Sequence, residues 1–413
     1  MTELAVEPLV RQVAWLLLGA AAVGLVTRWL RIPYAVALVL VGIAAGVITR
    51  QQGGTVPRLE PNVVLFAFLP PLLFDAAFRL DEREVRAVFP SILLLAVPGV
   101  LVTAGLVGLL VWVSLGLPLI VGLLFGSIVA ATDPVAVTAV FRRLDVHHRL
   151  GTIVEAESLV NDGTAITLYT ALLAAATQTP DTATGIAGAA AHALLVFVWE
   201  VVAGAAIGTA AGFLFSHLTA TIDDHLVEMA LSAALAYGSY LAADSVGASG
   251  ALACVAAGFV HGSYGRRIGM SQRTRDLLDA MWELLGFLAN GLLFLLVGLS
   301  ERPFLLWASA GAAAAAIGAV ALARLVVVEL STRLVPAERS LAGWAGRLVL
   351  AWGGLRGALT LALALSLPED LPGRTLVVTM AAAVVLFTMV VQGGSLPLVI
   401  HWTGLARPAG ADK

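Results

Sequence analysis

The chain has 413 residues, of which 60% are hydrophobic and only 12% are charged, and its net charge is -3. A mean hydropathy of +0.95 is too high for a soluble globular domain of this length, so the composition predicts an integral membrane protein. Long apolar runs favour helices over the alternating pattern of a membrane β-barrel. The sequence has no basic tail for nucleic acid and no glycine-rich phosphate loop for a nucleotide, and a single cysteine excludes an intramolecular disulfide and a thiolate metal cage. We therefore expect no cofactor, no nucleic acid and no nucleotide.

Charged or Pro- and Gly-rich breaks divide the chain into thirteen predicted transmembrane spans. They lie near 8–27, 33–49, 61–78, 87–113, 118–141, 152–177, 195–216, 225–243, 247–262, 277–299, 303–332, 347–367 and 374–400. Loops on one side hold seventeen of the 24 Lys and Arg residues and loops on the other side hold five, while Arg324 and Arg356 fall inside spans. This bias predicts that the N-terminus faces outward and the C-terminus faces the cytoplasm.

Thirteen spans can be divided into six, one and six, and an odd linker makes the second half an inverted copy of the first. In that arrangement span 5 corresponds to span 12, and span 6 to span 13. Inverted repeats with broken helices at the midplane are a common transporter architecture. The fold class predicted here is therefore an all-α polytopic membrane protein with two inverted six-helix repeats.

Four charged residues lie nine or ten residues inside four different spans: Asp133, Asp162, Arg324 and Arg356. At about 1.5 Å per residue, each lies roughly 14–15 Å deep in a hydrocarbon core about 30 Å thick. Charges at this depth are costly and usually mark a pathway or a site. We expect one functional cluster, with a purely structural ion-pair network as the alternative.

The stretch "ESLVNDGTA" in span 6 carries two neighbouring polar stripes. Ser158 and Asp162 share one face of the helix, and Glu157 and Asn161 form a stripe about 100° around it. One stripe can then face a cation while the other faces a structural partner. Pairing of Glu157 with one of the two buried arginines would leave Asp162 free.

The stretch "ATDPVAV" in span 5 predicts a broken helix. Pro134 donates no hydrogen bond and disfavours the helical conformation at Asp133, so carbonyls released around Thr132 can ligate a cation. A simple proline kink is the alternative. In span 12, "WGGLRGALT" has glycines that permit an irregular backbone, and it carries Arg356 where span 5 carries Asp133.

Other polar residues in the spans have two possible roles each. Thr152 and Glu155 at the start of span 6 fit a capping box, a structural role. Asp75 either lines an access funnel or is an interfacial carboxylate, and Asn290 is either an interhelical hydrogen bond or a site residue. Cys254 is expected in the core.

Carboxylate, hydroxyl, amide and carbonyl oxygens are the ligands of a small hard cation. A buried carboxylate can bind a proton or a metal cation but not both, and this competition couples two opposed fluxes. Because Asn161 is neutral, we expect one exchangeable charge per site and electroneutral exchange of one proton for one monovalent cation.

The segments "ATDPVAV", "ESLVNDGTA", "ELLGFLANGLLFLLVGL" and "GGLRGALTLALAL" resemble, in content and order, the monovalent cation:proton antiporter-1 family, NhaP-like members related to the animal sodium/proton exchangers. The resemblance implies a single sodium/hydrogen exchanger transmembrane domain over 1–413, a homodimer and elevator-like motion. It also implies core helices near 61–177 and 277–400, and dimer or scaffold helices near 8–49 and 184–262.

By this resemblance Asp162 carries the cation and the proton, and Asn161 belongs to the Asn-Asp motif of electroneutral members. Glu157 is the buried glutamate that pairs with an arginine, for which we favour Arg324, while Arg356 supports the helix crossover. Asp75 stands where some members place a longer acid, which leaves the access residue open. The implied sodium site consists of Asp162, Asp133, Ser158 and Thr132.

The expected function is therefore secondary antiport of Na⁺, and also Li⁺, against H⁺ across the cell membrane, contributing to pH homeostasis in contact with membrane lipid. A K⁺/H⁺ antiporter of the same fold is the nearest alternative. An intramembrane aspartyl protease using Asp133 and Asp162 is an alternative from another class, although the adjacent Pro134 and Asn161 do not fit it. An ion-regulated sensor would bind the cation without flux.

Overall fold

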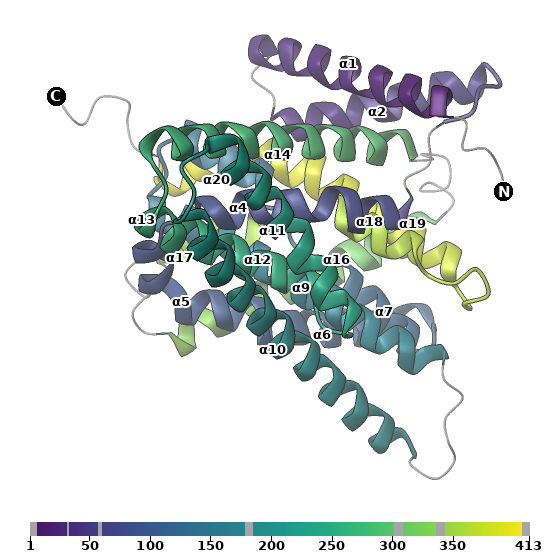
Figure 1. The fold of residues 1–413 in the computed structure, drawn as a ribbon. Coiled ribbons are helices and arrows are strands. Elements are labelled where there is room, and N and C mark those ends of the chain that lie inside the picture. The colour runs from purple at the N-terminus through teal and green to yellow at the C-terminus, as the bar shows by residue number, and fades with distance from the viewer. Residues whose placement is uncertain are drawn as a thin grey trace.

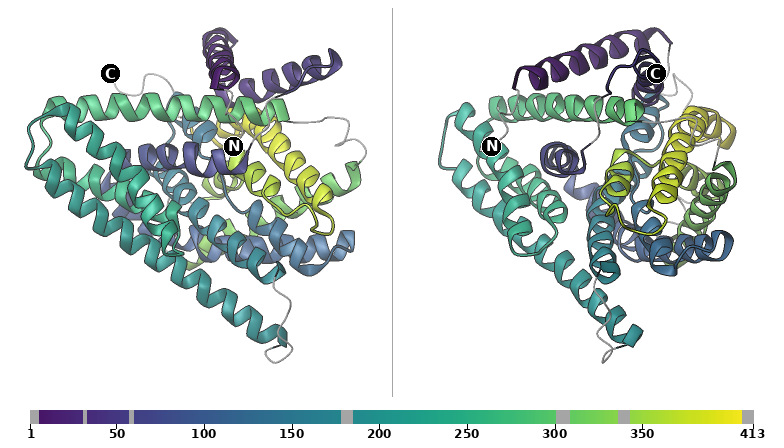
Figure 2. Two further views of the ribbon diagram at one scale, coloured as in Figure 1. Left: turned by 45° about the vertical axis from the view of Figure 1, so that its right-hand side comes forward. Right: turned by 90° about the vertical axis from the view of Figure 1, so that its right-hand side faces the viewer.

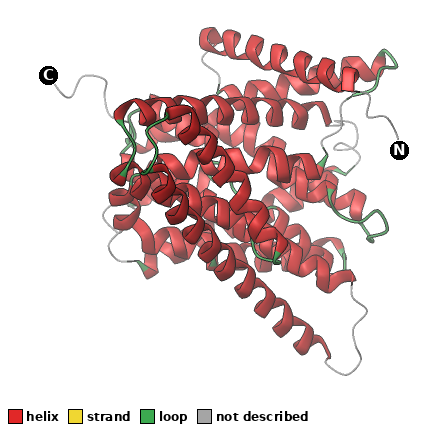
Figure 3. Ribbon diagram, in the orientation of Figure 1, coloured by secondary structure: helices red, strands yellow, loops and turns green. Residues whose placement is uncertain are grey.

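The computed structural model describes residues 6–30, 33–56, 60–177, 185–300, 309–335 and 343–406, and within them it contains helices and no strand (Figure 3). In the first part of the chain the helices are α1 (Val6–Leu30), α2 (Tyr34–Gln51), α3 (Pro61–Val63), the π-helical segment η1 (Val64–Phe68), α4 (Leu69–Arg79), α5 (Glu82–Ala96), α6 (Pro98–Leu115), α7 (Leu119–Ile128), α8 (Val135–Arg143) and α9 (His148–Thr177).

In the second part the helices are α10 (Gly185–Thr219), α11 (His225–Ser245), α12 (Gly250–Val260), the π-helical segment η2 (His261–Gly265), α13 (Arg266–Ile268), α14 (Gln272–Ser300), α16 (Ala310–Leu334), α17 (Trp344–Trp352), α18 (Ala358–Leu365), α19 (Arg374–Leu386), the π-helical segment η4 (Phe387–Gln392) and α20 (Gly393–Thr403). The all-helical fold class predicted from the sequence is confirmed.

Nine helical stretches in the described residues are long and apolar enough to cross a membrane, and each coincides with one of the thirteen predicted spans. The other four predicted spans are spans 1, 5, 9 and 12. Span 1 holds the apolar stretch Val13–Thr27, and span 9 is shared by α12 and η2. Spans 5 and 12 are each interrupted, by the gap between α7 and α8 and by the gap between α17 and α18. The start of the predicted scaffold segment at residue 184 lies outside the described residues.

The helices form two groups that lie side by side (Figures 1 and 2). In one group α2 packs along α14, α10 packs along α12, and α4 packs against α12 and α14. In the other group α6 packs along α7 and α16, α9 packs on α5 and α7, and α18 packs on α19. We refer to the first group as the scaffold group, and the division into core and scaffold helices expected from the sequence stays a prediction.

Glycines bring the helices of the scaffold group into close contact. A Cβ at Gly42 of α2 would lie 2.6 Å from the carbonyl oxygen of Leu295 on α14, and a Cβ at Gly204 of α10 would lie 2.5 Å from that of Ser249. Small residues at such positions let helix backbones approach, which is how membrane helices gain packing energy without a hydrophobic driving force between them. At these glycines the helices of the scaffold group therefore contact one another backbone to backbone.

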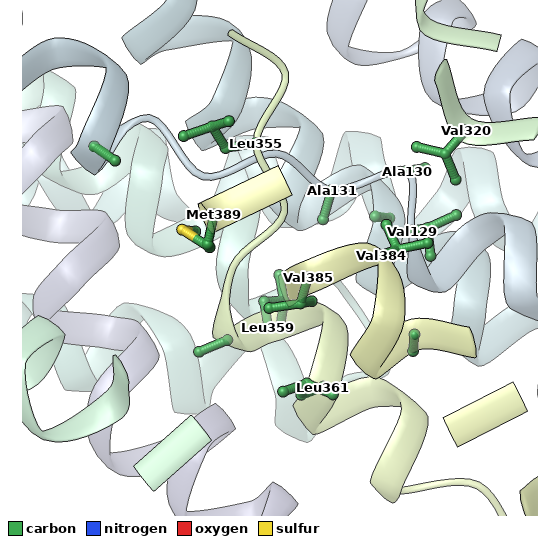
Figure 4. Packing of buried hydrophobic residues seen from close by; sticks show 14 of the residues in the cluster. Val129, Ala130, Ala131, Val320, Leu355, Leu359, Leu361, Val384, Val385 and Met389 are labelled. Carbon is green, nitrogen blue, oxygen red and sulfur yellow. The ribbon is translucent and has the colours of Figure 1, made fainter. Parts of the chain in front are cut away.

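The second group packs around two unwound segments that cross each other, 129–134 and 353–357 (Figure 4). The amide of Asp133 donates a 2.8 Å hydrogen bond to the carbonyl of Leu355, which joins the two segments directly. Val129, Leu355 and Met389 are fully buried around this crossing. Irregular backbone is tolerated at membrane depth only where protein or a cavity surrounds it, and both conditions are met here.

Candidate functional site

The two broken helices are explained by local sequence. Helix α7 ends at Ile128 and α8 begins at Val135, directly after Pro134, which confirms the break predicted from "ATDPVAV". Helix α17 ends at Trp352, and α18 begins only after the glycine-rich stretch that contains Gly353 and Gly357. The two spans that the repeat pairs with each other are thus both broken, while the inverted symmetry of the whole halves stays a prediction.

The crossing places an anion where helices begin and a cation where helices end. Asp133 Oδ1 accepts a 2.9 Å hydrogen bond from the Val135 amide at the N-terminus of α8, and the same carboxylate packs against Gly357 at the N-terminus of α18. Arg356 Nε donates to the carbonyl of Val129 just beyond the C-terminus of α7 at 2.9 Å, and its Nη1 donates to Gly354 beyond α17. Each charge therefore opposes the partial charge of two helix ends.

Asp162 stands in a cavity of about 320 Å³ that lies between the two helix groups. The cavity is lined from α4 and α14 on the scaffold side and from α8, α9 and α18 on the other, and Asp133 and Thr132 belong to its wall. Its exposed end lies at Arg79, Arg142 and Glu283, the last with 75% of its side chain exposed.

The Asp162 carboxylate has no hydrogen bond or ion pair with any other residue that the structure describes. The polar neighbours of Asp162 on α9 have other partners: Ser158 and Asn161 bond to Thr132, and Glu157 pairs with Arg324. A partly buried carboxylate that lines a cavity and has no protein partner is available to a proton or a cation.

Thr132, Ser158 and Asn161 tie helix α9 to the unwound part of span 5. The Asn161 side chain donates to Thr132 Oγ1 at 2.7 Å and accepts from the Thr132 amide at 3.2 Å. Thr132 Oγ1 and Ser158 Oγ are 2.9 Å apart. All three residues are buried, and of the three Thr132 lines the cavity together with Asp133. Of the five residues of the predicted cation and proton site, Asp162, Asp133 and Thr132 line the cavity, while Ser158 and Asn161 bond to Thr132 behind it.

Glu157 pairs with Arg324, the arginine favoured from the sequence. Both Glu157 oxygens contact the guanidinium of α16, with Arg324 Nη2 at 3.0 Å from Oε2 and Nη1 on Oε1. The two residues are 1% and 6% exposed, and Arg324 also donates to the Leu350 carbonyl at 3.2 Å. The pair thus links α9, α16 and α17, while Arg356 holds the crossing.

Asp75 and Asn290 both line the cavity that contains Asp162. Asp75 accepts a 2.6 Å hydrogen bond from Arg79 Nε near the exposed end. This position agrees with an access funnel. Cys254 is fully buried in the core, as predicted, and donates to the Pro70 carbonyl.

The capping box expected at Thr152 and Glu155 is wrong. Helix α9 begins at His148, four residues earlier, and the Thr152 hydroxyl donates to Glu84 Oε2 on α5 at 2.6 Å. Glu155 instead lines the cavity with Asp162. The sequence did carry a signal, because residues seven apart share a helix face, and Glu155 is seven residues before Asp162.

The fold and the cavity define a helical membrane transporter built around two crossed broken helices. The transmembrane sodium/hydrogen exchanger family model matches residues 15–402, and the chain belongs to this family. The family consists of secondary transporters, so the chain is a transporter and not an enzyme, and the aspartyl protease alternative is excluded.

Two relatives and one solved structure illustrate the match. The chain is 36% identical over 401 residues to the Na(+)/H(+) antiporter NhaH of Halobacillus aidingensis, covering 96% of this chain and 98% of the relative. It is 35% identical to the Na(+)/H(+) antiporter NhaP of Pseudomonas aeruginosa, covering 83% and 82%. The structure of the sodium proton antiporter MjNhaP1 from Methanocaldococcus jannaschii superposes with a TM-score of 0.73 at 20% identity, covering 96% and 98%, which shows the shared fold.

Proposed function

We propose that this chain exchanges Na⁺ for H⁺ across the cell membrane, with the two ions competing for Asp162. Relatives that match nearly the whole chain are named as Na⁺/H⁺ antiporters, which supports the choice of ions. The observation that carries the proposal is the Asp162 carboxylate itself, which lines the cavity without a hydrogen-bond or ion-pair partner in the described residues.

The groups around Asp162 suit an alkali cation. Asp133 and Thr132 line the cavity with a carboxylate and a hydroxyl, and Ser158 Oγ lies 2.9 Å from Thr132 Oγ1. Such hard oxygen ligands bind hard cations. Li⁺ fits the same chemistry, and K⁺ differs from Na⁺ only in size and in the cost of dehydration. Within the described residues no cluster of three or more His, Cys, Asp or Glu side chains could hold a metal ion, so the proposed site depends on mixed oxygen ligands.

One exchangeable charge per site supports electroneutral exchange. Asp133 is held by the Val135 amide and faces the first turns of α8 and α18, so it acts as a fixed charge of the crossing. Asn161 is neutral, and its amide is engaged by Thr132. Asp162 is then the group that alternates between the two ions, which gives one proton for one cation.

The position of the cavity between two helix groups supports alternating access. Near the other end of α9, Tyr169 Oη and Ser366 Oγ are 2.8 Å apart, so α9 meets the end of α18 on the side away from Arg79 and Arg142. Elevator-like movement of the α9 and α18 group against the scaffold would carry Asp162 from one side to the other. With the charge bias of the loops, the exposed end faces the cytoplasm, the N-terminus lies outside, and two copies form a dimer in the lipid bilayer.

The proposed function is tested by reconstituting the full chain into proteoliposomes with a pH-sensitive dye inside. Na⁺, Li⁺ and K⁺ are added in turn, with and without a clamped membrane potential. The proposal predicts dye responses to Na⁺ and Li⁺ that do not depend on the potential, and their loss in the Asp162→Asn variant. Exchange by that variant at the normal rate would overturn the mechanism. A response to K⁺ alone would favour the K⁺/H⁺ alternative.

A further inference from the structure

Thr360 lies on α18, the half-helix that follows the second break, and it is one of the residues that line the cavity containing Asp162 and Asp133. The residue is fully buried. Its hydroxyl oxygen has no hydrogen-bond partner among the residues that the structure describes. Buried polar groups in native proteins are almost always satisfied, so an unsatisfied hydroxyl on a residue that lines a cavity is a candidate for binding a ligand there.

The break in span 12 explains why this hydroxyl is free. Threonines inside helices commonly donate to a carbonyl three or four residues earlier, as Thr164 does to Val160 and Thr167 does to Gly163, both at 2.8 Å. Thr360 is only the third residue of α18, so the residues three and four positions before it, Gly357 and Arg356, precede the helix. The local acceptor within the helix is therefore absent, which leaves the hydroxyl of this cavity-lining residue without a partner.

The other hydroxyls near Asp162 are partly occupied. Thr132 and Ser158 bond to each other, and Thr132 also accepts from Asn161. These groups belong to α9 and to the unwound part of span 5, whereas Thr360 comes from the second broken helix. A cation between the two broken helices would then have oxygen ligands from both of them.

We propose that the Thr360 hydroxyl is an additional oxygen ligand in the coordination shell of the transported alkali cation, and that it sets the preference among Li⁺, Na⁺ and K⁺. The inference rests on the proposed function, because it assumes that a cation occupies this cavity. Ligand number and cavity size are the properties that distinguish hard cations of the same charge, so removal of one ligand shifts the preference as well as the affinity.

The test compares two substitutions of Thr360 with a matched control, using the full chain in proteoliposomes. Thr360→Val keeps the shape and removes the hydroxyl, and Thr360→Ser keeps the hydroxyl. Thr167→Val is the control, because Thr167 is equally buried but its hydroxyl is satisfied within α9. Half-saturating concentrations of Li⁺, Na⁺ and K⁺ are measured for each variant.

Thr360→Val is expected to raise the half-saturating Na⁺ concentration by about tenfold, in the range seen when groups supporting a metal site are removed, and to change the ratios among the three cations. Thr360→Ser and Thr167→Val are expected to stay close to the unmodified protein. If Thr360→Val lowers only the maximal rate or the thermal stability and leaves all three affinities unchanged, the role is structural and the inference is wrong.

Asp162→Asn in the same assay separates the inference from the function on which it rests. Continued exchange by Asp162→Asn would refute the proposed function. Loss of exchange in Asp162→Asn with unchanged cation affinities in Thr360→Val would refute the inference alone. Should Thr360→Val fail to fold, Thr360→Ala in a direct Na⁺ binding measurement takes its place, and normal affinity there counts against the proposal.

Discussion

At the scale of single residues, the charges near the crossing differ in whether they have partners. Glu157 and Arg324 are buried together and share two contacts, while Arg356 and Asp133 are held by backbone groups of the broken helices. Asp162 has no such partner in the described residues and lines the cavity. This division separates the charges that hold the crossing together from Asp162, the group proposed to exchange the two ions.

The Glu157–Arg324 pair gives the first prediction. Substitution of either residue by alanine leaves the other charge buried and uncompensated, which is expected to lower stability by about 3–5 kcal/mol. Replacement of both by leucine removes both desolvation costs and is expected to be less damaging than either single change. Thermal unfolding of the purified protein measures this, and single variants as stable as the unmodified chain would contradict the structural role assigned to the pair.

At the scale of elements, the close approach of the two broken helices depends on Gly357. A Cβ at this position would overlap the Asp133 carboxylate, so the N-terminus of α18 could not remain where it is. The same glycine precedes the first turn of α18, which carries Thr360. The position therefore controls both the fixed anion of the crossing and the cavity wall.

Gly357→Ala is predicted to abolish exchange and to destabilise the protein by about 1–3 kcal/mol through overpacking. The matched control is Gly318→Ala on α16, because a Cβ there would meet nothing within 4 Å and alanine favours the helix. Exchange rates in proteoliposomes and unfolding temperatures are compared for the two variants. Equal activity of both would show that the close contact at Gly357 is not needed.

Much of the secondary structure around the cavity could be predicted from the sequence, because the interactions that determine it are local. Pro134 cannot donate a hydrogen bond, so the break before α8 follows from the chain itself. The grouping of Ser158 with Asp162 and of Glu157 with Asn161 follows from helix periodicity. Selection of Arg324 over Arg356 did not follow from the spans alone and needed the family resemblance.

The failures concern features that depend on contacts between distant segments. Thr152 resembled a helix cap, but its hydroxyl bonds Glu84 on another helix, so α9 starts earlier and Glu155 turns toward the cavity. Nothing in the sequence indicated the role proposed for Thr360, because its hydroxyl lacks a partner only as a result of where α18 begins. The packing of α4 and α14 against α2 and α12 also depends on distant segments, so the division into core and scaffold helices stays a prediction.

At the scale of the whole molecule, the cavity lies between two groups of helices. Helices α4 and α14 form one wall and carry Asp75 and Asn290, while α8, α9 and α18 form the other and carry the proposed ion site. A movement between these groups would change which side of the membrane the cavity reaches without dismantling the crossing. The proposed elevator motion therefore requires few broken contacts within either group.

The central claim is that Na⁺ and H⁺ exclude each other at Asp162. Addition of NaCl to the purified protein in weakly buffered solution tests it most directly, with the released protons measured and choline chloride as the control for ionic strength. The account predicts about one proton released per bound Na⁺ and none in Asp162→Asn, since a single carboxylate cannot hold both ions. Sodium binding without proton release, or equal release from the Asp162→Asn variant, would contradict it.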